Sequence, residues 1–554
     1  MCNGETQGNV LYIRTIFHTL ESIGSLSQRD LFLTMTYWKL EKKKVKNYSH
    51  FDSRMTNSAA ESLANDPNTV AKHAFFPFLT YDKRWTEFAK AGNSGNVKTR
   101  PISYAARSDA YIYMRYRETL ANLYENKLNA TLLNDAILAY RKIVDPILGN
   151  GKCNIHFASE AFREIRKQRN CCAIAVDISN YFGSIDHQLL EKQLCNIVGM
   201  AKLPPDVLAI YKNITGYSSV NRLKAYERLG FFGSLPNSPP GKNFRGYLKP
   251  KHQIPKQLCS TKEFRQKIGG GDGKPSIIQK NPHKFGIPQG SPISDLLANI
   301  YLFEFDKFVQ SEIQKLGGRY TRYSDDILIV APVNAAKALE LEEWLRTLII
   351  QYGSKLKIKM AKSLILKFET TGDNQNYEIV YDGKSKTELV RFKYEELIGK
   401  QQDLLSSKSL KELSEEYDRG RTGINGFDYL GFRYDGSSIY LRDSTYSNLR
   451  RKIKTRCRIV VRKFVRERPT LSKSQLTALF VMEKKRLQEA FGKVRNFESG
   501  HVNPQQWTFT TYSKKISDIL DPKLNKVRRQ LRGLTKIIDS EADSAFADVL
   551  KNTI

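Results

Sequence analysis

The sequence predicts an α+β fold, an antiparallel sheet combined with helices, and three segments carry this prediction. Residues 171–176 form an uninterrupted small and apolar run, the pattern of a strand buried on both faces. Residues 319–330 pass from an aromatic run through two acids to a β-branched run, which indicates strand, tight turn and strand. Residues 285–306 lead from a Gly/Pro loop into a helix, with Ser291 as N-cap and Pro292 as first helical residue. A chain of 554 residues is long enough for two or three packed subdomains.

Carboxylates stand at the ends of these predicted strands. Asp177 closes the 171–176 run, and Asp325 and Asp326 occupy the turn of the second segment. Adjacent like charges repel and are costly to desolvate, and a bound cation relieves both problems. Mg²⁺ prefers oxygen ligands and commonly sits between carboxylates and substrate phosphates. An Asp-Asp turn alone is more often a solvated turn, so the metal interpretation depends on the three segments occurring together.

Together and in this order, the three segments resemble the palm of reverse transcriptases, in particular bacterial enzymes of the group II intron and retron type. The matching residues are Asp177 (motif A), 286–291 (Gly-Ile-Pro-Gln-Gly-Ser, motif B), 323–326 (Tyr-Ser-Asp-Asp, motif C), 96–102 (the basic fingers motif), 356–363 (motif D) and 427–432 (motif E, the primer grip). The resemblance covers roughly residues 75–435. It implies a right-hand polymerase with fingers, a palm built of an antiparallel sheet with helices, and a helical thumb.

The same resemblance divides the chain into four regions. We expect an N-terminal extension (1–70), fingers (71–170), a palm (171–435) with insertions near 200–284 and 370–425, and a basic helical thumb and C-terminal region (436–554). Helical patterns are expected around Leu31–Val45, over Arg107–Leu133 and over Asp518–Ile538. The tyrosines of the second of these helices are interpreted as part of an amphipathic core face rather than as a stacking surface.

By resemblance, the acids imply nucleotidyl transfer with two metal ions, Mg²⁺ or Mn²⁺ as its substitute, in which a primer 3′-oxygen attacks an α-phosphate. Asp177 and Asp325 are the first ligands, with the backbone carbonyl of Ile178 as a further one and Asp326 contributing less directly. Lys362 is the candidate proton donor to pyrophosphate, and an exposed strand lysine is the alternative reading.

The remaining site residues also follow from the matching motifs. Lys98 and Arg100 would clamp the triphosphate, and the Phe182 ring would exclude a ribose 2′-hydroxyl. The other expected contacts are Gln289 and Gly290 at the nucleotide and template base, and Tyr323, Tyr429, Leu430 and Gly431 at the primer.

The charge of the chain predicts a polyanionic partner. Lys and Arg total 89 against 57 acids, a formal net charge of +32, and phosphates would neutralise this self-repulsion. A solvated basic surface or an anionic membrane is the alternative, but 28 Tyr and 28 Phe available for base stacking favour nucleic acid. The charge concentrates at 441–468, with eleven Lys/Arg against two acids interleaved with apolar residues. This predicts a helix with one buried and one basic face, or else a merely solvated one; the candidate duplex contacts are Arg450, Arg451, Lys454 and Arg458.

The seven cysteines show no zinc-type spacing, no segment reads as a signal peptide, and no run approaches the length of a membrane span. We therefore expect a cytoplasmic protein with no membrane partner. The sequence leaves the oligomeric state open, a homo-oligomer included.

Several modules of related enzymes are not recognisable in the sequence: a His-Asn-His nuclease, a Cys-pair zinc motif, an RNase H carboxylate set and the Val-Thr-Gly thumb signature of retron enzymes. What remains resembles the "unknown group" or abortive-infection reverse transcriptases that act in antiphage defence. This implies dNTPs as substrate, DNA as product, and an RNA template such as a noncoding RNA, or untemplated synthesis. The alternatives are a retroelement reverse transcriptase, retron or intron-like, and a catalytically idle nucleic-acid-binding protein.

Overall fold

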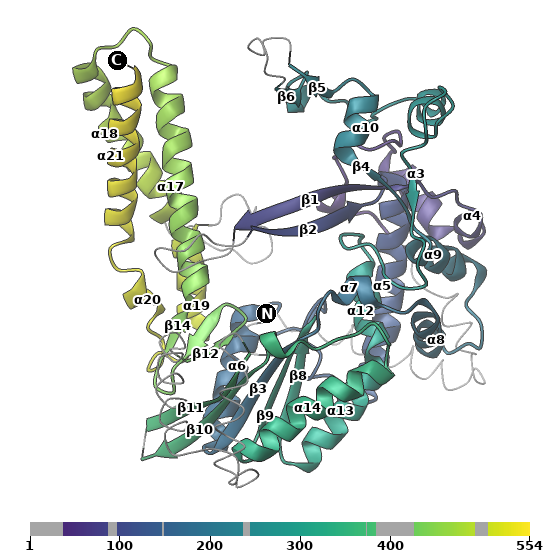
Figure 1. Cartoon of the computed structure of the whole chain (residues 1–554), viewed down its shortest axis with the longest axis vertical. Helices are drawn as coiled ribbons and strands as arrows, with labels where there is room; N and C mark the ends of the chain where they lie inside the picture. Colours follow the sequence, from purple (N-terminus) through teal and green to yellow (C-terminus); the bar gives the residue numbers. More distant parts are fainter. Residues whose placement is uncertain are drawn as a thin grey trace, which may run out of the picture.

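A computed structural model of the chain describes residues 37–86, 97–146, 149–235, 244–372, 374–383, 426–492 and 508–553. Helices and antiparallel sheets are both abundant in it, which confirms the α+β class (Figure 1). The expected helix around Leu31–Val45 lies partly outside the described residues, and its described part holds only the single 3-10 turn Lys42–Lys44. Most of the predicted insertion at 370–425 also lies outside them.

A five-stranded antiparallel sheet forms the centre of the molecule, in the order β11-β10-β3-β9-β8. Its strands are β3 (Cys171–Asp177), β8 (Arg319–Tyr323), β9 (Asp326–Ala331), β10 (Leu364–Thr371) and β11 (Asn374–Asp382). The first three confirm the predicted strand at 171–176 and the strand-turn-strand at 319–330. β11 corrects the expected interruption at 370–425. The first residues of that segment pair with β10 and extend the edge of the central sheet.

Alternating side chains of β3 place apolar residues on both faces of this sheet. Cys172, Ile174 and Val176 join one core, while Cys171 and Ala173 join another. The helices of the first core include α5 (Arg107–Asn129), α8 (His187–Val198), α9 (Pro205–Thr215), α12 (Ser294–Tyr301), α13 (Phe303–Lys315) and α14 (Ala335–Gln351). The elements of the second are α6 (Asn154–Gln168), β12 (Phe427–Tyr429), β13 (Phe432–Tyr434), β14 (Ile439–Leu441), α19 (Phe509–Ile519) and α20 (Val527–Gln530).

The start of α12 and the tyrosines of α5 were both predicted from the sequence. The helix predicted from Ser291 begins later, at Ser294, with the fully buried Ile293 as its N-cap. The tyrosines of α5 are buried, so their interpretation as a core face is confirmed. They are Tyr111, Tyr113, Tyr116 and Tyr124.

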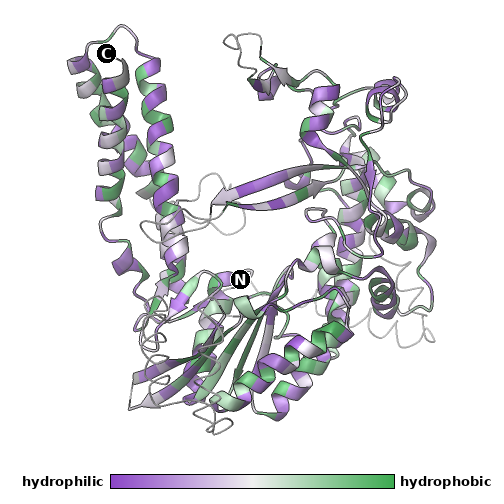
Figure 2. Ribbon diagram, in the orientation of Figure 1, coloured by the Kyte–Doolittle hydropathy of each residue, from purple (hydrophilic) through white to green (hydrophobic). Residues whose placement is uncertain are grey.

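A second sheet, ordered β2-β1-β4-β7, carries an arm that projects from the body (Figure 1). The arm is the antiparallel pair β1 (Phe78–Thr86) and β2 (Val97–Tyr104). The base of β1 packs in an apolar core, whereas its distal half is exposed. Figure 2 shows the arm as mostly hydrophilic, in contrast to the central strands. The insertion predicted near 200–284 supplies the other two strands, β4 (Ser218–Asn221) and β7 (Gln279–Lys280).

The C-terminal region forms a helical bundle on the other side of the molecule (Figure 1). Its helices are α17 (Asp443–Arg466), α18 (Lys473–Gly492) and α21 (Leu534–Thr553), and they share a separate apolar core. The helix predicted within 441–468 is confirmed. The helix predicted over Asp518–Ile538 is wrong, because α19 ends at Ile519 just before Pro522, which cannot continue a helix, and α21 starts only at Leu534. No helix within the described ranges is long and apolar enough to cross a bilayer.

Candidate active site

Three carboxylates from distant parts of the chain meet at one end of the central sheet. β3 and β9 pair antiparallel with Asp177 directly opposite Asp326. The amide of Ile178 donates to the carbonyl of Asp325 at 2.9 Å, which joins the end of β3 to the turn between β8 and β9. Residues opposite each other in such a pair have Cβ atoms about 5 Å apart. The predicted motifs A and C are therefore brought together by backbone pairing alone.

The turn that carries Asp325 adopts an unusual backbone. Ser324 has φ 63°, a left-handed conformation that is uncommon for residues other than glycine. Two contacts hold it: the Ser324 hydroxyl bonds to the Tyr140 hydroxyl at 3.1 Å, and its carbonyl accepts from the Arg322 guanidinium at 2.9 Å. Asp325 and Asp326 follow Ser324 directly, so the contacts that hold this turn also restrict the direction of both acids.

A fully buried ionic network lies beneath this turn and was not recognised from the sequence. The Arg322 guanidinium donates to Asp306 on α13 at 2.6 and 2.7 Å and to the side chain of Asn299 on α12 at 3.2 Å. The Tyr320 hydroxyl donates to the same Asp306 carboxylate at 2.6 Å. Burial raises the pKa of Asp306, and the charge of Arg322 opposes that shift. The sequence signal for this network was weak, because Arg322 shares the short strand β8 with a second arginine, Arg319, and a threonine.

The negative charges of the three carboxylates repel one another. Protein surrounds most of the Asp326 carboxylate although solvent still reaches it, and this desolvation, with the charges of Asp325 and Asp177, raises the pKa of Asp326 to about 7. Burial also raises the pKa of Asp177, against hydrogen bonding and charge from Lys362 and the charge of Lys98. The site thus holds more negative charge than its surroundings neutralise, and it would gain from a cation.

Lys362 supplies part of the missing positive charge. Its ammonium donates to the Asp177 carboxylate. It belongs to the single 3-10 turn Met360–Lys362 that precedes β10, so the alternative reading of a strand lysine is wrong.

The donor set suits a hard cation. Carboxylate oxygens match Mg²⁺ or Mn²⁺ better than metals that prefer sulfur or imidazole. In the conformation that the described residues adopt, no three His, Cys, Asp or Glu side chains are gathered tightly enough to hold a metal. Ile178, the predicted carbonyl ligand, has a fully buried side chain and its backbone bridges to Ile358. Closure of a metal site would therefore require Lys362 to leave Asp177 and the acids to converge.

The loop 286–290 contacts both the arm and the short helix α7 (Tyr181–Ser184), which carries Phe182. The Gln289 carbonyl accepts from the Ser103 amide of β2 at 2.8 Å, and the Ile287 amide donates to the Phe182 carbonyl at 2.9 Å. At Gly290 φ is 116°, and a Cβ there would lie 2.6 Å from the Ser103 carbonyl oxygen, so only glycine fits. The structure thus links the predicted nucleotide-contact elements through backbone contacts.

Lys98 and Arg100 lie on β2 two residues apart, so they share one face of the arm. The charge of Lys98 reaches Asp177, where it lowers that pKa, and the Arg100 guanidinium lies 5.5 Å from the Trp85 ring centroid. Phe182 is half-buried next to Tyr181, with ring centroids 5.9 Å apart. The arm therefore presents positive charge to the carboxylates from the side opposite the sheet.

The predicted primer contacts divide into backbone and side-chain groups. Leu430 and Gly431 both have positive φ, 46° and 94°, as a tight two-residue hairpin turn requires. Asn154 of α6 and the Arg442 amide hold their carbonyls at 3.1 and 3.0 Å. Tyr429 corrects the prediction: it is only 5% exposed and stacks on Phe427 in the core, because alternation along β12 turns it inward. Tyr323 is half-buried beside Phe157.

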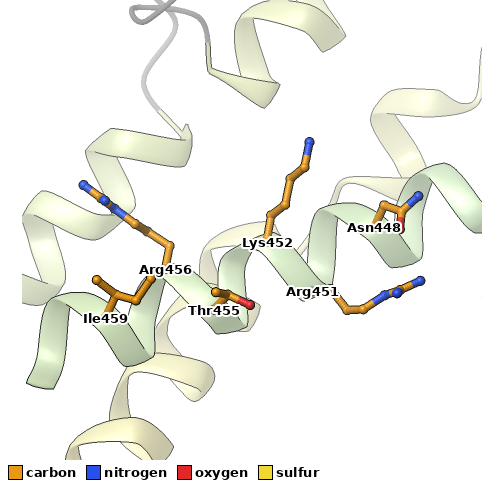
Figure 3. A pocket seen from close by; sticks show the side chains of 6 residues that line it. All are labelled: Asn448, Arg451, Lys452, Thr455, Arg456 and Ile459. Atoms are coloured by element: carbon orange, nitrogen blue, oxygen red, sulfur yellow. The ribbon is translucent and has the colours of Figure 1, made fainter. Parts of the chain in front are cut away.

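The exposed side of α17 carries the predicted basic residues and also a shallow groove. Arg450, Arg451, Lys454 and Arg458 are all exposed. A shallow groove, however, runs along the side opposite the buried stripe, and of those four residues only Arg451 lines it (Figure 3). The groove is lined by Asn448, Arg451, Lys452, Thr455, Arg456 and Ile459. Arg451 also donates to the Thr86 carbonyl at the end of β1 at 2.9 Å, so this face of α17 is turned to the arm.

Comparisons with known proteins identify no close relative. No family model and no curated protein matches the sequence. Among solved structures, telomerase from Candida tropicalis truncated from its C-terminal domain has 11% identity and a TM-score of 0.31, and the match covers 61% of each chain. Telomerase from Candida albicans in complex with the TWJ fragment of telomeric RNA has 11% identity and a TM-score of 0.31, covering 88% of this chain and 69% of the other. Similarities at this level carry no argument about activity.

Proposed function

We propose that this protein is an RNA-directed DNA polymerase of the right-hand type. The observation that carries the proposal is the meeting of Asp177, Asp325 and Asp326 at one end of the antiparallel sheet, facing the basic arm. In this proposal the central sheet and its helices are the palm (171–435), the arm belongs to the fingers (71–170), and the bundle is the thumb (436–554), with residues 1–70 as an N-terminal extension. The sequence motifs support the same assignment.

Each group has a chemical task in this proposal. Two divalent cations, Mg²⁺ or Mn²⁺, would lower the pKa of the primer 3′-hydroxyl and stabilise the leaving pyrophosphate. Asp177 and Asp325 would hold them, and Asp326 would support the pair. Lys98 and Arg100 would orient the triphosphate along the arm. Lys362, which contacts Asp177 in this structure, would turn from that carboxylate toward the phosphates and give a proton to pyrophosphate.

The direct test is DNA synthesis by the purified chain. We expect incorporation of dNTPs on a primed RNA template or on the nucleic acid that copurifies with the protein, and its loss when EDTA removes divalent cations. Untemplated addition is distinguished by sequencing the product. The proposal fails if neither kind of template, nor primer alone, supports synthesis with Mg²⁺ or Mn²⁺, and a nucleic-acid-binding protein without catalysis would then remain.

Phe182→Ala should let the enzyme accept ribonucleotides. Removing the ring opens space for a 2′-hydroxyl, so the ratio of rNTP to dNTP incorporation efficiency should rise by about tenfold or more. Tyr181→Phe is the matched control, because it alters the neighbouring aromatic residue without opening that space. An unchanged ratio in Phe182→Ala would make Phe182 a core aromatic residue only.

The groove on α17 should dominate the binding of duplex. Replacing Arg451, Lys452 and Arg456 by Gln should flatten the slope of log K against log salt by about 2.7, since each phosphate contact contributes about 0.9. The control replaces Lys473, Lys485 and Lys551, which are exposed elsewhere on the bundle. If both triple variants change the slope equally, the duplex is not held by the groove.

We further propose, from the resemblance to the "unknown group" and abortive-infection enzymes, that synthesis acts in antiphage defence in a bacterial cytoplasm, with a noncoding RNA as template or without one. Cells carrying the gene with its native flanking sequence should show fewer plaques, and cells carrying the Asp325→Asn variant should not be protected. Equal protection by both would make synthesis irrelevant to defence. No protection by the wild type against a broad phage panel would favour the alternative of a retroelement enzyme, retron or intron-like.

A further inference from the structure

The insertion between the two acidic motifs concentrates positive charge away from the carboxylates. Residues 218–284 contain fourteen Lys/Arg against three acids. The cations are Arg222, Lys224, Arg228, Lys242, Arg245, Lys249, Lys251, Lys256, Lys262, Arg265, Lys267, Lys274, Lys280 and Lys284. A segment with this charge balance fits a polyanion by charge complementarity. None of the residues assigned to the proposed catalysis lies in it.

Within this segment a small antiparallel hairpin stands apart from the central sheet. Its strands are β5 (Phe232–Ser234) and β6 (Arg245–Tyr247), with Phe232 opposite Tyr247. In Figure 1 it projects at the top of the view from beyond α10 (Arg222–Arg228), on the same side of the molecule as the arm. The hairpin does not contribute to the central sheet, so it does not help to position the three carboxylates.

Aromatic rings and cations alternate on this hairpin. The rings of Phe232 and Tyr247 meet edge to face at 5.5 Å. The Arg245 guanidinium lies 5.8 Å from the Phe232 ring centroid, and the Lys251 ammonium lies 4.8 Å from that of Tyr247. Beside them, Phe244 is 51% exposed and Leu248 is 44% exposed. Rings that accept bases, with cations within reach of the linking phosphates, are the components of single-strand binding surfaces.

The hairpin is anchored in the body of the insertion. The Arg245 guanidinium pairs with Glu227 of α10 at 2.6 Å. The Leu248 amide donates to the Phe231 carbonyl at 3.0 Å, which ties the end of β6 to the residue before β5. Phe232 and Tyr247 pack with one side against the apolar core of this region. Because the hairpin is already held in place, it loses little conformational entropy of its own when a ligand binds.

We propose that this hairpin platform, formed by Phe232, Phe244, Arg245, Tyr247, Lys249 and Lys251, binds a single-stranded polynucleotide outside the carboxylate site. A duplex hides its base faces and would use the cations alone, whereas a single strand uses the rings as well. Under the proposed function the bound strand is unpaired template, and that assignment rests on the proposed function. The binding itself is independent of catalysis.

Binding of labelled oligo(U), oligo(dT) and a duplex of equal length to the full chain tests the platform. The protein is freed of nucleic acid and kept in EDTA, so catalysis plays no part. The platform variant carries Phe244→Ala, Lys249→Gln and Lys251→Gln. The matched control carries Phe308→Ala, Lys307→Gln and Lys315→Gln on α13, whose phenylalanine is 42% exposed. Thermal unfolding of both variants is compared with the wild type.

We expect the platform variant to lose about tenfold or more in affinity for single strands, with a salt slope smaller by about 1.4, and to lose less affinity for duplex, which meets the two lysines but not the ring. The control should bind like the wild type. Loss for both oligo(U) and oligo(dT) identifies a site that ignores the sugar, and loss for oligo(U) alone identifies an RNA site; both support the proposal. Equal losses for single strands and duplex, or no loss, overturn it.

Photocrosslinking of 4-thiouridine oligonucleotide to the wild type should label residues 232–251, and crosslinks confined to other segments also overturn it. Neither failure would affect the proposed polymerase activity.

Discussion

Asp177→Asn and Asp325→Asn should each abolish DNA synthesis without weakening nucleic-acid binding. An amide keeps the shape of the carboxylate but loses the negative charge that would hold a divalent cation. Loss of a residue that merely orients a metal ligand typically costs 10–100-fold, so loss of the ligand itself should lower incorporation by more than about 100-fold. Affinity for primer and template should stay equal or rise, because each substitution removes a charge that repels phosphate.

The assay is dNTP incorporation under conditions where the wild type is active, together with binding of the same primed template. Asp543→Asn is the control, since this exposed aspartate pairs with Lys484 on the bundle, far along the chain from the site. The crowding of charge at the site also predicts an order. Asp326→Asn should cost less than the other two, because burial and the neighbouring acids raise the pKa of Asp326 to about 7, so its carboxyl is only partly ionised near neutral pH. Incorporation at the wild-type level in both Asp177→Asn and Asp325→Asn would exclude a two-metal site built on these acids.

Asp306→Ala should destabilise the central sheet by about 3–5 kcal/mol, the usual cost of removing one partner from a buried ion pair. The Arg322 guanidinium would remain fully buried with its main acceptor gone. The turn at Ser324 would lose support as well, since the same guanidinium holds its carbonyl. Hydrogen exchange of peptides covering 319–331 measures this locally, which matters because a chain with separate cores need not unfold in one step.

The double variant Asp306→Leu, Arg322→Met is the informative control. It removes both charges and retains apolar volume, and such replacements are often close to neutral. We expect its exchange protection to lie between those of Asp306→Ala and the wild type, or to match the wild type. Wild-type protection in Asp306→Ala would mean that the pair contributes nothing to the stability of the sheet.

The strands that carry the acids could be predicted from sequence because their signals are local. β3 is a continuous apolar run, and the β8–β9 turn lies between a tyrosine-containing strand and an apolar, β-branched one. β11 was missed because its first residues, 374–376, are polar and conceal the short apolar run Ile379–Tyr381 that packs into the cores. The Arg322–Asp306 pair was equally hidden, since the two residues face each other only after β8 packs on α13.

Side-chain direction was the second limit. The residues of motif E located the β12–β13 hairpin, but the inward direction of Tyr429 depends on the register of that hairpin against the core. The charges of α17 identified a basic helix, whereas its outward face is set by packing against α21. The break before Pro522 has a local cause that is present in the sequence, because the proline ring cannot continue the helical pattern of 518–538.

The contact between Gly290 and Ser103 has a consequence for the evolutionary record of this chain. At position 290 no side chain is tolerated, and the partner that forbids it is a main-chain oxygen. Any residue at position 103 presents the same oxygen, so drift there would leave the restriction unchanged. Among descendants of this sequence, position 290 should therefore remain glycine whatever side chain stands at position 103. A contact of this kind leaves no correlated substitutions, and methods that infer proximity from paired changes will not detect the junction between the arm and this loop.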